Sequence, residues 1–524
     1  SDPGPYHHEP PAEWRRLDVR AAVAAQVDAA PGGFGKDVPA VIDGQRVRTA
    51  RTIASSDPAD PETVVATSAS CGPAEADAAV TAAERAWEEW RRTPVRERSA
   101  VLFRAAEWLR ARRHELAALE VFEAGKPWAE ADGDVCEAID FCEYYGREMF
   151  RLDQGGPVDS PPGEANVLRY QGKGIGVVIA PWNFPLAIPT GMVTASLVAG
   201  NAVLFKPAEQ TPAIAYRLVE ALEAAGLPPG VLAFLPGVGE EVGAYLVEHP
   251  AVAFVAFTGS KDVGLRINRA AADSSGTQHV KRVVAELGGK NALVVDGDAD
   301  LDQAVPAVAA SAFGYAGQKC SAASRLVVVD AVYDETVARL LGHTRELPIG
   351  HPRAMPVKVG PLIDAEAWKR VQGVVDRAAD DGTVLLARDD VPAKGYFVGP
   401  TVVADVATDS WLARDEIFGP VLTVFRARDF EHAIAIANDT TFALTAGVFS
   451  RSPVNVRLAA EELRAGNVYV NRGITGAVVG RQPFGGYGLS GVGSKAGGPD
   501  YLLQFVDPRV VTENTIRQGF APTA

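Results

Sequence analysis

Cysteine is scarce in this sequence, and long apolar runs are absent. The chain of 524 residues has four cysteines, at positions 71, 136, 142 and 320. Their spacing matches neither a metal site nor a disulfide framework, so we expect free thiols and no bound metal. No apolar run reaches the roughly 18 residues of a membrane-spanning helix. Because the N-terminus also lacks the basic and apolar regions of a signal peptide, we expect a cytoplasmic protein without a membrane partner.

Basic residues are the minority charge. Lys and Arg number 51 against 66 Asp and Glu, which gives a net charge of −15. This balance argues against nucleic acid or an anionic membrane surface as the main partner. It does not exclude an anionic small molecule, because local donors decide how such a ligand binds. A chain of this length is expected to form two or three domains.

Short β-rich runs alternate with alanine-rich helical segments from residue 174 onward. One set of runs lies at 174–180, 202–205, 231–235 and 253–257, and a second at 292–295 and 325–329. Such alternation is typical of parallel sheets covered by helices, so it predicts two α/β domains. Residues 151–172 look like a hairpin that belongs to neither sheet. Residues 501–517 have strand character and could pair with another chain.

Cys320 is the most informative cysteine. It lies in the run of small residues Gly314-Tyr-Ala-Gly-Gln-Lys-Cys-Ser-Ala-Ala-Ser-Arg325, and Glu286 lies in Val283-Val-Ala-Glu-Leu-Gly-Gly-Lys-Asn291. A thiol and a carboxylate, each beside glycines that let a substrate approach the backbone, indicate covalent thiol chemistry. Taken alone, however, a cysteine is more often a small buried apolar residue than a nucleophile.

Asn183 is a candidate oxyanion donor. It lies in Pro181-Trp-Asn-Phe-Pro185, directly after the run that ends at Ala180. The carboxyl ends of parallel strands are where α/β proteins form ligand sites, and an amide NH₂ can donate to a developing oxyanion. Without other evidence, an asparagine that only shapes a turn is the simpler interpretation.

Three further segments place charges or free N–H groups at strand ends. Leu204-Phe-Lys-Pro-Ala-Glu209 offers a lysine and a carboxylate to ribose hydroxyls, and the carboxylate would repel an adenosine 2′-phosphate. Phe257-Thr-Gly-Ser-Lys-Asp-Val-Gly264 leads from a strand into a helix whose first N–H groups could meet a pyrophosphate. Glu416-Ile-Phe-Gly-Pro420 could hold a second ribose and flank a nicotinamide. Each segment alone fits an ordinary loop or a surface ion pair equally well.

Together these motifs resemble the aldehyde dehydrogenase superfamily, in that family's order and over roughly residues 40–510. Two stretches and the tail narrow the resemblance to the Δ1-pyrroline-5-carboxylate dehydrogenase branch of the superfamily. They are Ala316-Gly-Gln-Lys-Cys-Ser-Ala-Ala-Ser-Arg325, Asn471-Arg-Gly-Ile-Thr-Gly-Ala-Val-Val-Gly-Arg-Gln-Pro-Phe-Gly-Gly486 and Gly493-Ser-Lys-Ala-Gly-Gly-Pro-Asp-Tyr-Leu502.

The resemblance implies an aldehyde dehydrogenase-like α/β fold with two Rossmann-type domains and a projecting β element for oligomerisation. It assigns residues 1–150 and 173–288 to an NAD-binding domain and residues 289–485 to a catalytic domain. Residues 151–172 and 486–524 would form the oligomerisation element, in which a strand of one subunit extends a neighbour's sheet. A homo-oligomer is expected, either a dimer or a trimer of dimers, and a proline dehydrogenase is a candidate partner.

The resemblance also implies a mechanism. Cys320 would attack an aldehyde, and the oxyanion would be held by the amide of Asn183 and the N–H of Cys320. A hydride would pass to NAD⁺, and Glu286 would activate the water that hydrolyses the resulting thioester.

The cofactor and substrate residues follow from the same motifs. The cofactor NAD would be bound by Ile179, Ala180, Pro181, Trp182, Lys206, Glu209, Gly239, Gly259, Ser260, Leu287, Glu416 and Phe418. Gly239 belongs to Gly237-Val-Gly239, which by itself is more consistent with a tight turn. The substrate would contact Glu137, Phe184, Ser321, Thr475, Gly476, Ala477 and Phe484.

The expected reaction is NAD-dependent oxidation of L-glutamate γ-semialdehyde to L-glutamate in proline breakdown. Small residues at Thr475-Gly-Ala477 and the hydroxyl of Ser321 would allow close approach of the substrate's α-carboxylate. Three alternatives stay open. They are oxidation of another semialdehyde such as succinate semialdehyde, a thiol hydrolase that needs no nicotinamide, and a catalytically silent homologue.

Overall fold

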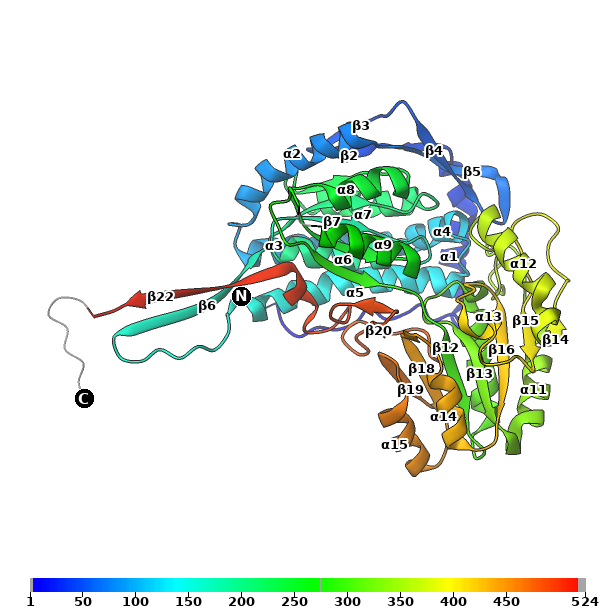
Figure 1. Cartoon of the computed structure of the whole chain (residues 1–524). Coiled ribbons are helices and arrows are strands. Elements are labelled where there is room, and N and C mark those ends of the chain that lie inside the picture. Colours follow the sequence, from blue (N-terminus) through cyan, green and yellow to red (C-terminus); the bar gives the residue numbers. More distant parts are fainter. Residues whose placement is uncertain (1–2, 274, 517–524) are drawn as a thin grey trace.

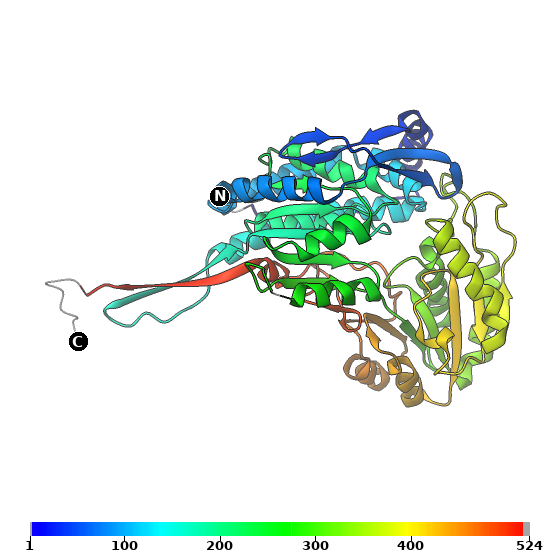
Figure 2. The ribbon, with the colours of Figure 1, turned by 45° about the horizontal axis from the view of Figure 1, so that its top comes forward.

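The computed structural model describes residues 3–273 and 275–516. It consists of two α/β units and a long two-stranded ribbon that extends away from both (Figure 1). The ribbon still projects when the molecule is turned, so it is a true extension (Figure 2). None of the helices formed by these described residues is long and apolar enough to cross a membrane.

The first unit contains an eight-stranded sheet with the order β21-β11-β10-β7-β8-β9-β2-β3. The five strands β11, β10, β7, β8 and β9 are parallel, and the outer strands are antiparallel to their neighbours. Their bounds are β2 Ala40–Ile42, β3 Gln45–Val47, β7 Ile175–Ile179, β8 Ala202–Lys206, β9 Leu232–Phe234, β10 Val252–Thr258, β11 Arg282–Glu286 and β21 Gly491–Val492. The predicted alternation of strands and helices therefore corresponds to one parallel sheet here.

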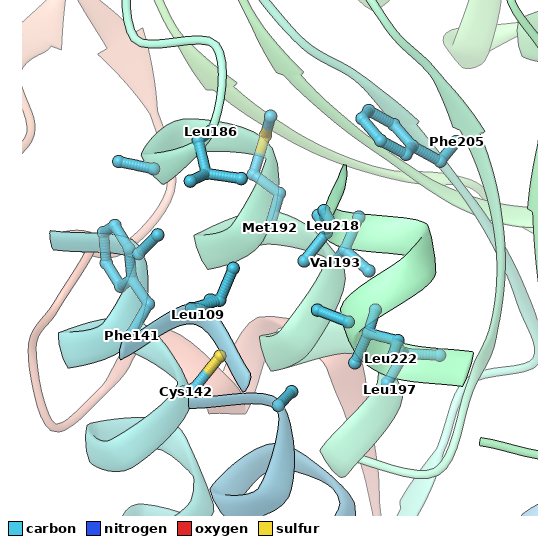
Figure 3. Packing of buried hydrophobic residues seen from close by; sticks show 14 of the residues in the cluster. Leu109, Phe141, Cys142, Leu186, Met192, Val193, Leu197, Phe205, Leu218 and Leu222 are labelled. Carbon is cyan, nitrogen blue, oxygen red and sulfur yellow. The ribbon is translucent and has the colours of Figure 1, made fainter. Parts of the chain in front are cut away.

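Helices cover both faces of this sheet. They are α1 Leu17–Ala29, α2 Pro73–Trp90, α3 Val95–Ala111, α4 Arg113–Glu123, α5 Trp128–Asp153, α6 Ala187–Val198, α7 Pro212–Ala224, α8 Ala244–Glu248 and α9 Lys261–Ala272. A small sheet of β1 Lys36–Val38, β5 Asp60–Ala69 and β4 Thr52–Asp57 lies beside them. Figure 3 shows apolar side chains of α3, α5, α6, α7 and β8 meeting in the core, with the thiol of Cys142 among them. Cys142 is thus a buried apolar residue, the ordinary role of a cysteine.

The second unit contains a seven-stranded sheet with the order β14-β15-β16-β13-β12-β18-β19, parallel except at β14. The strands are β12 Asn291–Val295, β13 Ala323–Val329, β14 Thr383–Ala387, β15 Thr401–Ala404, β16 Val421–Ala427, β18 Thr445–Phe449 and β19 Asn467–Val470. The helices are α10 Leu301–Phe313, α11 Tyr333–Arg345, α12 Ala365–Asp381, α13 Trp411–Arg414, α14 Phe430–Asn438 and α15 Pro453–Glu462. The central strands are buried on both faces, which explains their nearly continuous Val, Leu and Ala.

Several of the helices begin at residues whose side chains cap them. Ser260, Asp300, Asp364, Asp429 and Ser452 accept backbone N–H groups of α9, α10, α12, α14 and α15 through their side chains. Such caps are worth about 1 kcal/mol each because they satisfy N–H groups that have no partner within the helix.

The projecting ribbon pairs β6 Glu164–Gly172 with β22 Val506–Asn514, antiparallel along its whole length. The prediction of a hairpin within residues 151–172 holds only in part. Gly156 forms an isolated antiparallel bridge with Leu168, but α5 continues to Asp153, and β6 pairs along its whole length with a strand more than 300 residues later in the same chain. Sequence alternation does not reveal which strand is the partner when the pairing is this distant.

Residues 487–505, which the sequence assigned to the projecting element, pack against the body instead. β20 Tyr487–Gly488 pairs with β17 Phe442–Ala443, and β21 pairs with the end of β11. A 3₁₀ turn, Tyr501–Phe505, is buried in the core of the first unit. The ribbon itself is therefore limited to β6 and β22.

Candidate active site

A cavity of about 740 Å³ lies where loops of the two sheets meet. Loops at the carboxyl ends of β7, β10 and β11 form one wall, as expected for a ligand site of parallel α/β sheets. The opposite wall includes Cys320 and the segments around α12 and α13. Nine predicted site residues line this cavity: Pro181, Trp182, Asn183, Gly259, Ser260, Leu287, Cys320, Glu416 and Phe418.

A left-handed turn delivers Cys320 to the cavity. Tyr315, Ala316 and Gly317 follow α10 with φ values of 54°, 55° and 69°. For residues other than glycine this conformation costs roughly 1–2 kcal/mol each. The Tyr315 hydroxyl donates to the carbonyl of Ala124 at 2.6 Å, a contact that holds the turn against the first unit.

Gln318 fixes the chain between this turn and Cys320. Its side-chain amide donates to the carbonyls of Tyr315, at 3.3 Å, and Pro361, at 3.1 Å. Its Oε1 accepts the N–H of Ile363 at 3.0 Å. Gln318 is fully buried, so these bonds are protected from water and hold the nucleophile loop in one place.

Asn183 lies next to the cysteine loop, where an oxyanion donor is needed. Its Nδ2 donates to the carbonyl of Gln318 at 3.1 Å, and its own carbonyl accepts a bond from Lys126 Nζ at 2.7 Å. An amide NH₂ has two N–H groups, so one remains for a substrate oxygen. The structure therefore brings Asn183 and Cys320 together, as the sequence predicted.

Glu286 lies at the end of β11, in register with Thr258 of β10. Its Oε2 accepts no hydrogen bond from any residue that the structure describes. A Cβ on Gly485 would lie 2.8 Å from Glu286 Oε1, so this glycine allows the close approach of the two segments. Burial raises the pKa of Glu286 to about 8, and the positive charge of Lys495 acts against this shift.

Cys320 shares that electrostatic environment. Burial raises the pKa of the Cys320 thiol, and the negative charges of Glu286, Glu416 and Glu137 raise it further. The thiol is therefore protonated at neutral pH, and a neighbouring group must accept its proton before it can act as a nucleophile. Glu286 is the carboxyl whose charge acts most strongly on this thiol, and it can accept the proton only in its ionised form.

Lys206 and Glu209 form a second polar cluster at the end of β8. Lys206 Nζ lies 3.1 Å from Glu209 Oε1, and the same oxygen accepts the N–H of Gly239 at 2.6 Å. The end of β7 adjoins it, since the Ala180 N–H donates to the Lys206 carbonyl at 3.2 Å and Ile179 pairs with Lys206. Gly239 thus lies in the cluster as the partner of Glu209, although its motif alone indicated only a turn.

The helix α9 presents its N-terminus to the cavity. Gly259 and Ser260 precede it, and the Gly259 N–H donates to the Glu286 carbonyl at 3.1 Å. The Ser260 hydroxyl accepts the Val263 N–H at 3.4 Å, which caps the helix. The positive end of the helix dipole and the free N–H groups of its first turn suit a phosphate group.

Glu416 and Phe418 form the far wall. Glu416 Oε1 accepts the Gly289 N–H at 3.1 Å, and a Cβ on Gly288 would lie 2.1 Å from Glu416 Oε2. Burial raises the pKa of Glu416, while the bond from Gly289 lowers it. Phe418 adopts a φ of 55° and packs edge-on against Trp182 with ring centroids 5.6 Å apart. These aromatic faces and Leu287 suit a flat ring, so the cavity fits a nicotinamide dinucleotide.

The predicted substrate residues lie outside the walls of this cavity. Gly476 has a φ of 77°, which favours glycine, and the Thr475 and Gly476 carbonyls accept bonds from Arg472 at 3.3 and 3.4 Å. Phe484 exchanges two backbone bonds with Ala496, at 2.9 and 2.8 Å. The substrate role of Phe484, Thr475, Gly476 and Ala477 stays a prediction.

The other three predicted substrate residues lie near the catalytic groups. Burial raises the pKa of Glu137 to about 8, and its charge is felt by Cys320. The Phe184 ring contacts Lys126, and the carbonyl of the buried Ser321 accepts a bond from the Thr445 hydroxyl at 3.2 Å.

Sequence reasoning missed several residues that hold this site. Gln318 and Lys319 are in the cysteine motif and could have been singled out for that reason; Lys319 Nζ lies 2.6 Å from Glu130 Oε1. Lys126 gave no signal, because its partner Asn183 is distant in sequence. Lys495 lies in the motif at residues 493–502, but its partner Asn467 could not be inferred from that motif.

Comparison with known proteins shows which family has this sequence and this arrangement of residues. The sequence profile described as "Aldehyde dehydrogenase family" matches residues 46–511. The 1-pyrroline-5-carboxylate dehydrogenases of Geobacillus kaustophilus (strain HTA426) and Geobacillus thermodenitrificans (strain NG80-2) are 48% and 47% identical to the chain over 510 residues. Both alignments cover 97% of this chain and 99% of the relative.

Solved structures agree with this result. A 1-pyrroline-5-carboxylate dehydrogenase from Thermus with bound NAD superposes with a TM-score of 0.96 at 43% identity, covering 98% of this chain and 99% of that one. Proline utilization A (PutA) from Bdellovibrio bacteriovorus superposes with a TM-score of 0.98 at 46% identity over 100% of this chain, which spans only 55% of that longer protein. The chain belongs to the aldehyde dehydrogenase family.

Proposed function

We propose that this protein is an NAD-dependent dehydrogenase that oxidises L-glutamate γ-semialdehyde, the open form of Δ1-pyrroline-5-carboxylate, to L-glutamate. The observation that carries the proposal is that Cys320 and Asn183 line one cavity, while Glu286, directly before the lining residue Leu287, lies close enough for its charge to act on the Cys320 thiol. The substrate assignment is supported by relatives named 1-pyrroline-5-carboxylate dehydrogenase, which match almost the full chain.

The reaction begins at Cys320. Its thiol proton passes to the carboxylate of Glu286, and the sulfur forms a bond to the aldehyde carbon. The free N–H of the Asn183 amide and the backbone N–H of Cys320 stabilise the resulting oxyanion, and each such donor is worth roughly 3–4 kcal/mol in the transition state.

Bound NAD⁺ supplies the hydride acceptor. Lys206 and Glu209 would hold one ribose, Glu416 the other, and the N-terminus of α9 the pyrophosphate. The carboxylate of Glu209 repels a 2′-phosphate, which favours NAD⁺ over NADP⁺.

Loss of the hydride leaves a thioester on Cys320. Glu286, having released its first proton to solvent, takes a proton from water, and the hydroxide attacks the thioester carbon. The carbon–sulfur bond breaks, the Cys320 sulfur takes the proton held by Glu286, and the product leaves as a carboxylate after losing its own proton to solvent. The same carboxylate therefore serves both halves of the reaction.

The two units divide this work. Residues 1–150 and 173–288 bind NAD, and residues 289–485 carry the catalytic cysteine. The β6–β22 ribbon serves oligomerisation, at least as a dimer and in the larger case as a trimer of dimers. It exposes Val510 and Val511, at 60% and 46%, which a partner subunit would cover. Four free thiols fit a reducing cytoplasm, and a proline dehydrogenase is the proposed supplier of substrate.

The central test is an assay of NADH absorbance with Δ1-pyrroline-5-carboxylate and, separately, with succinate semialdehyde. A higher kcat/KM for the first substrate is expected, because specificity is a difference in transition-state binding. Equal or lower kcat/KM for it would contradict the substrate assignment, and ester hydrolysis without any NAD⁺ binding would contradict the dehydrogenase. Light scattering of the wild type and of a Val510→Glu, Val511→Glu variant tests the role of the ribbon. The wild type should have the molar mass of an oligomer, and the variant should have a lower molar mass.

A further inference from the structure

Lys126 is a fully buried lysine in the short link between α4 and α5. Its ammonium donates to the main-chain carbonyl of Asn183 at 2.7 Å. Its nearest carboxylate oxygen, Asp134 Oδ1, lies 3.9 Å away, which is a long contact for an ion pair. A buried cation is expensive unless polar partners replace its water. Among the described residues, the carbonyl of Asn183 is the hydrogen-bond acceptor of this ammonium.

Two aromatic rings complete the environment of the ammonium. Lys126 Nζ lies 4.0 Å from the centroid of the Phe184 ring and 4.9 Å from that of Tyr315. Phe184 follows Asn183 directly, and Tyr315 begins the left-handed turn that leads to Cys320. Cation–π contacts of this kind are worth about 2 kcal/mol when they are shielded from water. One ammonium therefore contacts both loops that supply the oxyanion donors.

The link between α4 and α5 makes a second contact with the left-handed turn that precedes Cys320. The Tyr315 hydroxyl donates to the carbonyl of Ala124, two residues before Lys126. On the other side, Asp134 of α5 accepts the N–H groups of Leu186 and Ala187 at 3.0 and 3.3 Å, which holds the start of α6 after the Asn183 loop. Both loops are thus attached to one rigid segment of the first unit.

Asn183 is consequently held at both ends. Lys126 holds its main-chain carbonyl, and the Gln318 carbonyl accepts one N–H of its side chain. The direction of the remaining N–H is fixed by these two bonds together. We propose that Lys126 is the positioning residue of the oxyanion site, acting through the carbonyl of Asn183 and through the rings of Phe184 and Tyr315.

A methionine at position 126 tests this directly, because it fills a similar volume without an ammonium. Lys126→Met should lower kcat by about 10- to 100-fold, somewhat less than the loss of an oxyanion donor itself. The KM for NAD⁺ should stay within about twofold, since no proposed cofactor residue contacts Lys126. A raised KM for NAD⁺ with an unchanged kcat would overturn the proposal.

Lys281→Met is the matched control. Lys281 is also largely buried, and its ammonium also donates to backbone carbonyls, those of Val247 at 2.6 Å and His249 at 2.9 Å. These lie away from the cavity walls. The control should keep kcat within about twofold, because only a buried ammonium bond remote from the oxyanion site is lost. An equal loss in both variants would mean that any buried lysine has this effect, and the proposal would fail.

A double-mutant cycle with Asn183→Ala separates positioning from general support. If Lys126 acts through Asn183, Lys126→Met should cost less than about threefold in the Asn183→Ala background. If the fold-losses in kcat of the two single variants multiply in the double variant, Lys126 acts independently of Asn183, and the proposal is contradicted. If the methionine variant does not fold, as judged by its thermal unfolding, the cycle is run with Lys126→Arg, whose extra length displaces the Asn183 carbonyl, and the same non-additivity is expected.

The inference rests on the proposed function only through the oxyanion role of Asn183. If the wild type does not oxidise glutamate γ-semialdehyde but does oxidise propanal, the substrate assignment fails alone. The cycle is then measured with propanal, and its outcome still decides the role of Lys126.

Discussion

The carboxylates proposed to bind the cofactor and the carboxylate proposed to act in catalysis differ in how completely they are partnered. On the cofactor side, Glu209 is held by Lys206 and by the Gly239 N–H, and Glu416 by the Gly289 N–H. On the catalytic side, one oxygen of Glu286 accepts no hydrogen bond from a described residue. Partnered groups are fixed in one geometry, which suits binding. A buried group without a partner keeps a shifted pKa and the freedom to exchange a proton, which suits catalysis.

This contrast predicts its largest effect at Cys320. Cys320→Ala should lower dehydrogenase activity by about 10⁴-fold or more, because the covalent route is lost. The dissociation constant of NAD⁺, measured by fluorescence titration, should change by less than about twofold, because the partnered side is untouched. Activity that survives the substitution would exclude the thioester mechanism.

Glu286→Gln should have the next largest effect, about 10²- to 10⁴-fold on steady-state kcat. The amide can accept neither the thiol proton nor a proton from water, and we expect hydrolysis to slow more than acylation, so that the thioester accumulates. Acid-quenched samples examined by mass spectrometry should then show the acylated chain. If no acyl-enzyme forms and the rate is unchanged, Glu286 is not the base.

The pH dependence follows from the same carboxyl. Burial raises the pKa of Glu286 to about 8, so the group is protonated below that pH and cannot act as a base. With saturating substrates, kcat should rise about tenfold per pH unit up to about pH 8 and then level off. Glu286→Gln should remove this slope, and a slope that persists in the variant would assign it to another group.

Glu209→Gln should have a smaller effect, confined to the cofactor. Losing the charged acceptor should raise the KM for NAD⁺ by about tenfold, the value of one hydrogen bond to a charged group. The preference for NAD⁺ over NADP⁺ should fall, because the repulsion of a 2′-phosphate is removed. Glu223→Gln, which loses a partly exposed ion pair with Arg46, is the control and should leave both values unchanged.

Much of this architecture was predictable from the sequence. The alternation of β-rich and helical segments predicted two parallel sheets, and the α/β fold and membership of the aldehyde dehydrogenase family are both confirmed. Local signals are sufficient for such elements, because a buried parallel strand must be apolar along its length. The roles of the individual site residues stay predictions, although Cys320 and Asn183 meet where the motifs placed them.

What could not be predicted depends on distant contacts. The partner of β6 is β22, and no local pattern selects that pairing. In the sequence, nothing distinguishes Lys126 from another lysine that precedes a proline. Its hydrogen bond to the carbonyl of Asn183 is seen only in the folded chain. Lys495 likewise has a visible motif but no visible partner, and the structure shows it bound to the carbonyls of Gly466 and Gly485.

The smallest effect is expected when the Glu-to-Gln change is made at Glu416. Burial already raises the pKa of this carboxyl, and an amide oxygen can still accept the Gly289 N–H that now binds Oε1 at 3.1 Å. The KM for NAD⁺ should therefore rise by only about threefold, with little change in the rate of thioester hydrolysis. Glu286 and Glu416 are both partly buried carboxyls whose charges act on Cys320, so the same substitution compares them directly. If both variants lost the same activity, hydrogen-bond partnering would not distinguish the catalytic side from the cofactor side.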